Sequence, residues 1–129
     1  MKTLRIAILS WEAMYSVRSG GQAPAVTGLA EALAKKGHDV HFFTRTGEGQ
    51  TADEDIEGVH YHRCVFDPGG NIVEYCHNMS NAMLQRVYDV EEEGGFDLVH
   101  GHDWHVVDAL HELKGSRPLL LTFHSTEFG

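Results

Sequence analysis

The stretch LRIAILSWEAMYSVRSGGQAPAVTGLAEALAKKGHDVHFFT, residues 4–44, decides the fold, because it has the pattern of a strand, a long loop, a helix and a second strand. Leu4–Leu9 is a short apolar run with β-branched residues, which predicts a buried strand. The apolar residues between Ala23 and Leu33 share one helical stripe, and Gly37 predicts the end of that helix. Val40–Thr44 predicts the second strand. A strand, a crossover helix and another strand indicate a parallel pair.

The same alternation continues along the chain. Further strands are predicted at Val59–Val65, Asp97–His100 and Pro118–Phe123, and apolar helix faces at Met79–Val90 and Val106–Leu113. Five strands that alternate with helices predict an α/β fold, a Rossmann-like doubly wound parallel sheet with helices on both faces.

More specific expectations attach to four of the segments. We expect Arg45–Glu57 to be a polar loop and Glu91–Glu93 to be a solvated helix end. His60 and His62 alternate on a polar strand, which predicts solvated residues at a sheet edge. Pro118–Phe123 is nearly all apolar, as expected of a strand that is covered on both faces.

Composition excludes several classes of function. With 129 residues the chain is long enough for one domain, and its net charge of −9 offers no basic face to nucleic acid. No apolar run approaches the roughly 20 residues of a membrane span, and none resembles a signal peptide. Cys64 and Cys76 lack Cys-x-x-Cys spacing, which predicts free thiols in a reducing compartment. We therefore expect a cytoplasmic protein with no transmembrane segment and no nucleic-acid partner.

A glycine pair lies in the loop after the first strand. Gly20 and Gly21 have no Cβ, so a ligand can approach their backbone, and the helix that follows offers free N–H groups. Arg18 adds a positive charge, which suits a phosphate-bearing ligand, and a flexible loop before a helix start stays as the alternative. A dinucleotide site is disfavoured, because about ten residues separate the strand from Gly20 and Thr44-Arg45-Thr46 replaces the acidic residue expected there.

Histidines lie at the end of the fourth predicted strand, Asp97–His100, at the sheet edge where doubly wound folds bind ligands. In the segment HGHDWH, His100 and His102 can point the same way, whereas His105 begins a helix, so we expect no metal site. Asp103 is predicted to cap that helix, and Trp104 to pack beside the cap. From spacing alone, a structural role of His102 is favoured slightly over a ligand contact.

The last predicted strand ends in the segment FHSTEFG, residues 123–129. It places His124 at the same edge, one strand over. Ser125 follows with other small hydrogen-bonding groups, which suit either a hydroxyl-rich ligand or an ordinary turn.

Three segments together resemble the N-terminal domain of a GT-B glycosyltransferase. They are SGGQAPAVTGLAEALAKKGHDVHFFT (19–44), DLVHGHDWH (97–105) and LLLTFHSTEFG (119–129). The chain is similar to the retaining group 1 enzymes, family GT4, and to their glycogen- and starch-synthase relatives. The resemblance implies transfer of a sugar from a nucleotide-sugar donor to an acceptor hydroxyl. It also implies two Rossmann-like domains that face each other across a cleft, and no metal or other cofactor.

The resemblance assigns the glycine loop to the donor. Gly20 and Gly21 match the glycine pair that approaches the donor diphosphate, and Arg18 stands where the synthases often have a lysine. Backbone N–H groups and the guanidinium would stabilise the charge that develops on the leaving diphosphate. Same-face attack assisted by that phosphate would retain the configuration of the sugar.

The resemblance also assigns the histidine segments. His102 matches the histidine that lines the transferred sugar and is the catalytic residue we expect, with Asp103 and Trp104 holding its turn. His124 matches the histidine on the acceptor side, and Ser125 is expected to bind sugar or acceptor beside it. The acceptor, whether a glucan, a lipid or a small molecule, stays open.

One departure from the family is large, because the family continues beyond the position matched by Gly129. We interpret residues 1–129 as an incomplete N-terminal, acceptor-side domain without the C-terminal nucleotide-sugar-binding domain, and expect no transfer by this chain alone. Two alternatives remain: a stand-alone nucleotide- or sugar-binding module, and a nucleotide-sugar epimerase of the GT-B type.

Overall fold

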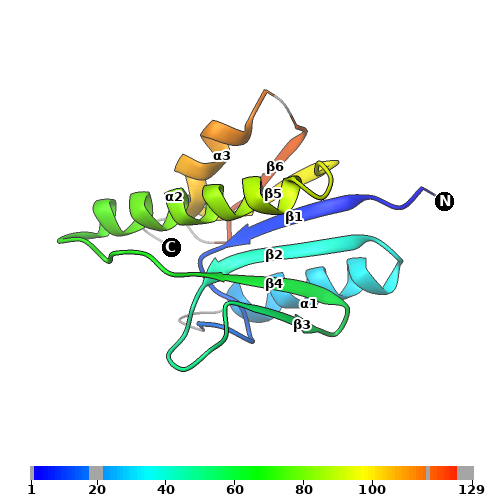
Figure 1. Cartoon of the computed structure of the whole chain (residues 1–129), viewed down its shortest axis with the longest axis horizontal. Coiled ribbons are helices and arrows are strands. Elements are labelled where there is room, and N and C mark those ends of the chain that lie inside the picture. Colours follow the sequence, from blue (N-terminus) through cyan, green and yellow to red (C-terminus); the bar gives the residue numbers. More distant parts are fainter. Residues whose placement is uncertain (1, 18–21, 116, 125–129) are drawn as a thin grey trace.

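The fold is a six-stranded sheet with helices on both faces (Figure 1). The computed structural model describes residues 2–17, 22–115 and 117–124. In chain order the elements are β1 (Arg5–Ser10), α1 (Gln22–Lys35), β2 (Asp39–Arg45), β3 (Asp53–Ile56), β4 (Val59–Cys64), α2 (Ile72–Glu91), β5 (Leu98–His102), the short 3-10 helix η1 (Trp104–Val106), α3 (Val107–Leu113) and β6 (Leu119–Thr122). The strand order is β3-β4-β2-β1-β5-β6, and each described pair is parallel except β3 with β4.

Two apolar layers hold the helices to the sheet. Alternate residues of β1 enter opposite layers: Ile8 packs on the side of α1, and Leu9 on the side of α2 and α3 (Figure 1). This alternation follows from the two-residue period of a strand. The predicted doubly wound α/β fold is confirmed. In the described part of the chain, no helix has both the length and the apolar character needed to cross a membrane.

The chain reverses its direction of travel across the sheet at β1. β2 pairs with one side of β1, and β5 returns to pair with the other side. The loop after β1 and the turn after β5 therefore lie at the same end of neighbouring strands. In open α/β sheets this is where ligands bind.

The predicted polar loop before the third strand contains a strand of its own. β3 is antiparallel to β4, and its carboxylates bond to side chains of β4: Asp53 to His62 at 3.0 Å, Glu54 to Arg63 at 2.8 Å, and Asp55 to His60 at 2.7 Å. β4 is therefore not an edge strand. The expectation of solvated edge residues is wrong for His62, which is buried.

Two further expectations need correction. Glu91 is not part of a solvated helix end, because it accepts a hydrogen bond from Arg117 Nε at 2.7 Å and is mostly buried. β6 is not covered on both faces: Leu120 and Leu121 are exposed, and β6 is the edge strand of the described sheet.

We predict that Gly101→Ala destabilises the fold and that Gly28→Ala does not. A Cβ at Gly101 would lie 2.9 Å from Cγ of the buried Leu110, so α3 would have to shift away from β5, at a cost of about 1–3 kcal/mol. A Cβ at Gly28, inside α1, would meet no described atom within 4 Å. Because alanine has the higher helix propensity, Gly28→Ala should raise the free energy of unfolding by at most about 1 kcal/mol. Urea unfolding compares the two variants, and equal stabilities would contradict the packing of α3 on β5.

Candidate functional site

Polar side chains line the carboxyl ends of four neighbouring strands. Arg45 ends β2, Ser10 ends β1, His102 ends β5 and Thr122 ends β6. The register pairs Ser10 with His102 and His102 with Thr122, so these residues form one row along the sheet edge. The sequence predicts that the segments after the first, fourth and fifth strands share one edge of the sheet. These strands are β1, β5 and β6, and the prediction is confirmed.

His102 is buried between two other histidines. Its Nδ1 lies 2.8 Å from Nε2 of His124, and its ring centroid lies 4.0 Å from that of His100. Burial, and to a smaller extent the neighbouring His100 and His124, lower the pKa of His102 to about 3, so the ring is neutral at pH 7. Its Nε2 is buried and has no hydrogen-bond partner among the described residues. Since buried polar atoms almost always have partners, this nitrogen is suited to receive a ligand group.

The three histidines of HGHDWH do not converge. His100 and His102 point to the same side of β5, as predicted, and His100 Nε2 lies 2.8 Å from Thr122 Oγ1. His105 lies in η1 and packs on Trp11, with ring centroids 4.2 Å apart. Burial lowers the pKa of both His100 and His105. The row therefore presents neutral imidazoles at pH 7.

Asp103 makes the turn between β5 and η1. Its backbone N–H donates to Thr122 O at 2.8 Å, and its φ of 65° lies in the left-handed region that favours glycine. Asp103 occupies the predicted N-cap position, but its side chain makes no capping hydrogen bond. A capping side chain needs an extended backbone at the cap residue, which Asp103 does not have.

A stack of planar side chains runs along the edge. The Arg45 guanidinium carbon lies 3.7 Å from the Trp11 ring centroid, Trp11 lies 4.2 Å from His105, and His105 lies 4.2 Å from Trp104. Arg45 also donates from Nε to Trp11 O at 2.6 Å and from Nη1 to the Tyr75 hydroxyl at 2.9 Å. Trp104 packs on His105, as expected beside the turn, but it is exposed at the end of this stack, so the expectation that it is partly buried is wrong.

A pocket of about 450 Å³ opens beside the stack. It is lined by Trp11, Arg45, Tyr75 and residues 68–72, from the loop before α2 and its first turn. Sequence reasoning missed these three side chains as site residues. The sequence position of two of them could have identified them as site residues. Trp11 directly follows β1 and Arg45 ends β2, so both lie at the carboxyl edge of the sheet, where the sequence predicts a ligand site.

The N-terminus of α1 already receives a carboxylate. Glu12, which is buried, accepts a hydrogen bond from the Ala23 N–H at 2.8 Å, and Pro24 has no N–H to offer. Gln22 Nε2 donates to Ser10 Oγ at 2.8 Å and ties the helix start to β1. Negative charge is favourable at this end of a helix. Glu12 therefore meets part of the anion preference that the sequence assigned to a phosphate.

Four predicted site residues, Arg18, Gly20, Gly21 and Ser125, lie outside the described residues, and their roles stay predictions. Gln22, which follows the glycine pair, is the first residue of α1. The predicted start of the helix near Gln22 is therefore confirmed.

Metal-ligating side chains meet at the opposite end of the sheet. Within the described residues, Asp39, His41 and His60 each offer one ligand atom, and these atoms lie within 4.8 Å of one another. All three residues lie near the amino ends of β2 and β4, away from the row that contains His102.

Sequence comparisons show that the chain is similar to glycosyltransferases. The sequence model of the family described as Glycosyltransferase Family 4 matches residues 19–128. An uncharacterized glycosyltransferase of Methanocaldococcus jannaschii is 32% identical over 98% of this chain, which covers 32% of that protein. A D-inositol 3-phosphate glycosyltransferase of Arthrobacter is 35% identical over 83% of this chain, and 27% of that protein is covered. The chain thus spans less than a third of the length of these curated relatives.

A solved structure supports the fold. The sucrose-phosphate synthase of Thermosynechococcus elongatus superposes on 94% of this chain with a TM-score of 0.74 and 23% identity, and 33% of that chain is covered. The sheet and its helices therefore have the Rossmann-like arrangement of a GT-B domain.

We predict that His102 makes the fold sensitive to mild acid. Histidine in the unfolded chain titrates near pH 6.5, whereas burial holds the pKa of His102 at about 3. The stabilisation is present above about pH 6.5 and is lost as the pH falls toward 3, because the unfolded state then binds more protons. At pH 5 the loss from this residue is about 2 kcal/mol. Urea unfolding at pH 7 and pH 5 should show a smaller loss in His102→Gln, and an equal loss would contradict the burial of His102.

Proposed function

The chain belongs to glycosyltransferase family 4, and on this premise we propose that it forms one wall of the cleft in which a sugar passes from a nucleotide-sugar donor to an acceptor hydroxyl. The observation that carries the proposal is the buried Nε2 of His102, which has no partner among the described residues at the ligand-binding edge of the sheet. The activity is proposed for the whole protein that contains these residues.

His102 is assigned to the transferred sugar. Its Nε2 can exchange a hydrogen bond with a sugar hydroxyl, and its neutral ring would not repel the positive charge that develops on the sugar as the glycosidic bond breaks. Because Nε2 is buried, the sugar must displace part of what covers it. His124 contacts the other nitrogen of the same ring, Nδ1, and lies at the surface.

The start of α1 is assigned to the donor diphosphate. The bond between sugar and diphosphate breaks while a new bond to the acceptor oxygen forms, and the acceptor proton passes to a phosphate oxygen on the same face, with retention. The backbone N–H groups of Gly20 and Gly21, with Arg18, would stabilise the departing charge. Glu12 already holds the Ala23 N–H, so the diphosphate is expected on the loop side of the helix end. No metal takes part in this proposed step.

The pocket beside Trp11 is assigned to the acceptor. Its size suits a small hydroxyl-bearing molecule or the end of a longer one, and Arg45 is the charged residue among those that line it. The Arthrobacter relative is by name an enzyme of D-inositol 3-phosphate, a small phosphorylated polyol. The ring of Trp11 is fixed between Arg45 and His105, so this wall is preformed.

We predict that His102→Ala in the whole enzyme lowers kcat about 10- to 100-fold, with less than a threefold change in the KM for the donor. The reason is that Nε2 contacts the sugar more strongly as charge develops. Steady-state transfer assays measure both constants, and His111→Ala, an exposed histidine of α3, is the matched control. An unchanged kcat in His102→Ala would remove His102 from the site.

The same assay distinguishes the alternatives to transfer. Glycosylated acceptor supports the transferase. Free nucleotide with an epimerised sugar, formed without any acceptor, would instead identify a GT-B epimerase. Saturable binding of a nucleotide-sugar with no turnover by the whole protein would identify a binding module.

We predict that Trp11→Leu raises the acceptor KM about tenfold and leaves the donor KM unchanged, because it removes a wall of the pocket and the support of Arg45. The matched control is Tyr88→Leu, at an exposed aromatic residue of α2. Equal effects on donor and acceptor would place the pocket outside the acceptor site.

A further inference from the structure

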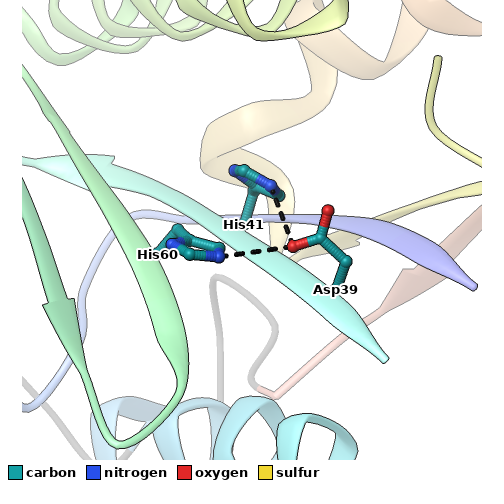
Figure 2. Close-up of side chains that lie close together, drawn as sticks. All are labelled: Asp39, His41 and His60. Carbon is teal, nitrogen blue, oxygen red and sulfur yellow. Dashed lines mark ion pairs between the residues drawn. The ribbon is translucent and has the colours of Figure 1, made fainter. Parts of the chain in front are cut away.

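Three ligand atoms converge near the amino ends of β2 and β4. Asp39 Oδ1 lies 3.2 Å from His41 Nε2 and 3.3 Å from His60 Nε2 (Figure 2). Asp39 begins β2, His41 follows two residues later on the same strand, and His60 is the register partner of His41 on β4. The parallel ladder therefore sets the spacing of the two rings.

A chain of hydrogen bonds fixes the proton of His41. The Asp53 carboxylate can only accept, so His62 donates to it from Nδ1 at 3.0 Å and keeps a lone pair on Nε2. That lone pair lies 2.9 Å from Nδ1 of His41, which must then be the donor. A neutral His41 thus carries a lone pair on Nε2, directed at the Asp39 carboxylate.

His60 is set in the same way by its own carboxylate. Its Nδ1 lies 2.7 Å from Asp55 Oδ1, so Nδ1 donates and Nε2 keeps the lone pair. This Nε2 also faces Asp39 Oδ1. Three electron-rich atoms then point at one another with no hydrogen between them, an arrangement that repels unless a cation lies among them.

We propose that Asp39, His41 and His60 bind one divalent transition-metal ion, Zn²⁺ in the first place. Imidazole nitrogen and carboxylate oxygen are ligands that Zn²⁺ prefers. With metal–ligand bonds of about 2.0–2.1 Å, neighbouring corners of a tetrahedron lie about 3.3 Å apart. The separations of 3.2 and 3.3 Å from Asp39 Oδ1 match that edge.

The surroundings supply an outer shell of the kind that metal sites use. A metal-bound histidine commonly donates its other ring N–H to a carboxylate, as His60 does to Asp55 and as His41 does to Asp53 through His62. Arg5 Nε holds the second oxygen of Asp39 at 3.1 Å and leaves Oδ1 for the ion.

A proton is the competing cation, and the packing of His41 opposes it. The ring lies 5.2 Å from His62 and 5.5 Å from Phe96, and its side chain is 8% exposed. By contrast, the side chains of Asp39 and His60 are 46% and 40% exposed, so an ion can enter from solvent and keep water as a fourth ligand. The ion would link β2 to β4 at the end of the sheet opposite His102, and this inference does not rest on the proposed transfer activity.

The test is Zn²⁺ binding by the untagged protein after removal of metal with a chelator. Isothermal titration should give one ion per chain, and Co²⁺ in its place should give the visible bands of a four-coordinate ion. His60→Gln and Asp39→Asn should each weaken Zn²⁺ binding at least tenfold, and Asp55→Asn should weaken it about 10- to 100-fold. Circular dichroism checks that each variant is folded.

The matched control is His77→Gln. His77 pairs with Asp108 at 3.2 Å on the surface between α2 and α3, with no third ligand in its described surroundings. Its loss should leave Zn²⁺ binding unchanged. The proposal is overturned if the wild-type protein shows no saturable binding, if folded His60→Gln binds as the wild type does, or if His77→Gln weakens binding equally.

Discussion

The parallel pairing of β1 with β2 on one side and with β5 on the other is the constraint on which the rest of the structure depends. β1 is buried on both faces, so a shift of one residue would move Ile8 and Leu9 into the wrong layers. The register is therefore firm, and with it the position of Ser10 beside His102. Apolar residues in the middle of the strands thus determine where the polar residues at their ends meet.

The two ends of this sheet differ in chemistry. The carboxyl edge carries neutral, half-enclosed imidazoles and a cation held against an aromatic ring, which suits hydroxyl groups and phosphate. The amino edge carries carboxylates beside histidines, which suits a metal cation. Because the strands are parallel, one ladder builds both sites without requiring contact between them.

The order of strands and helices could be predicted because apolar periodicity marks buried elements. β3 could not, since its sequence DEDI has no apolar face and is held by side-chain pairs to β4. The pairing of Glu91 with Arg117 could not be predicted either, because it joins side chains that are 26 positions apart in the sequence. His102 and His124 could be placed from strand ends alone, whereas the stack around Trp11 depends on how α2 and η1 pack over the edge.

The left-handed backbone of Asp103 has a consequence for anyone who engineers this protein. A non-glycine residue in that conformation costs of order 1–3 kcal/mol, and here the strained residue is buried directly beside His102. A laboratory selection for heat resistance alone would therefore enrich Asp103→Gly, which relaxes the backbone at that position. The enriched clones would lose a buried carboxylate from the turn next to the proposed sugar site. At this position, selection for thermal stability would therefore favour glycine, whereas selection for activity would favour aspartate.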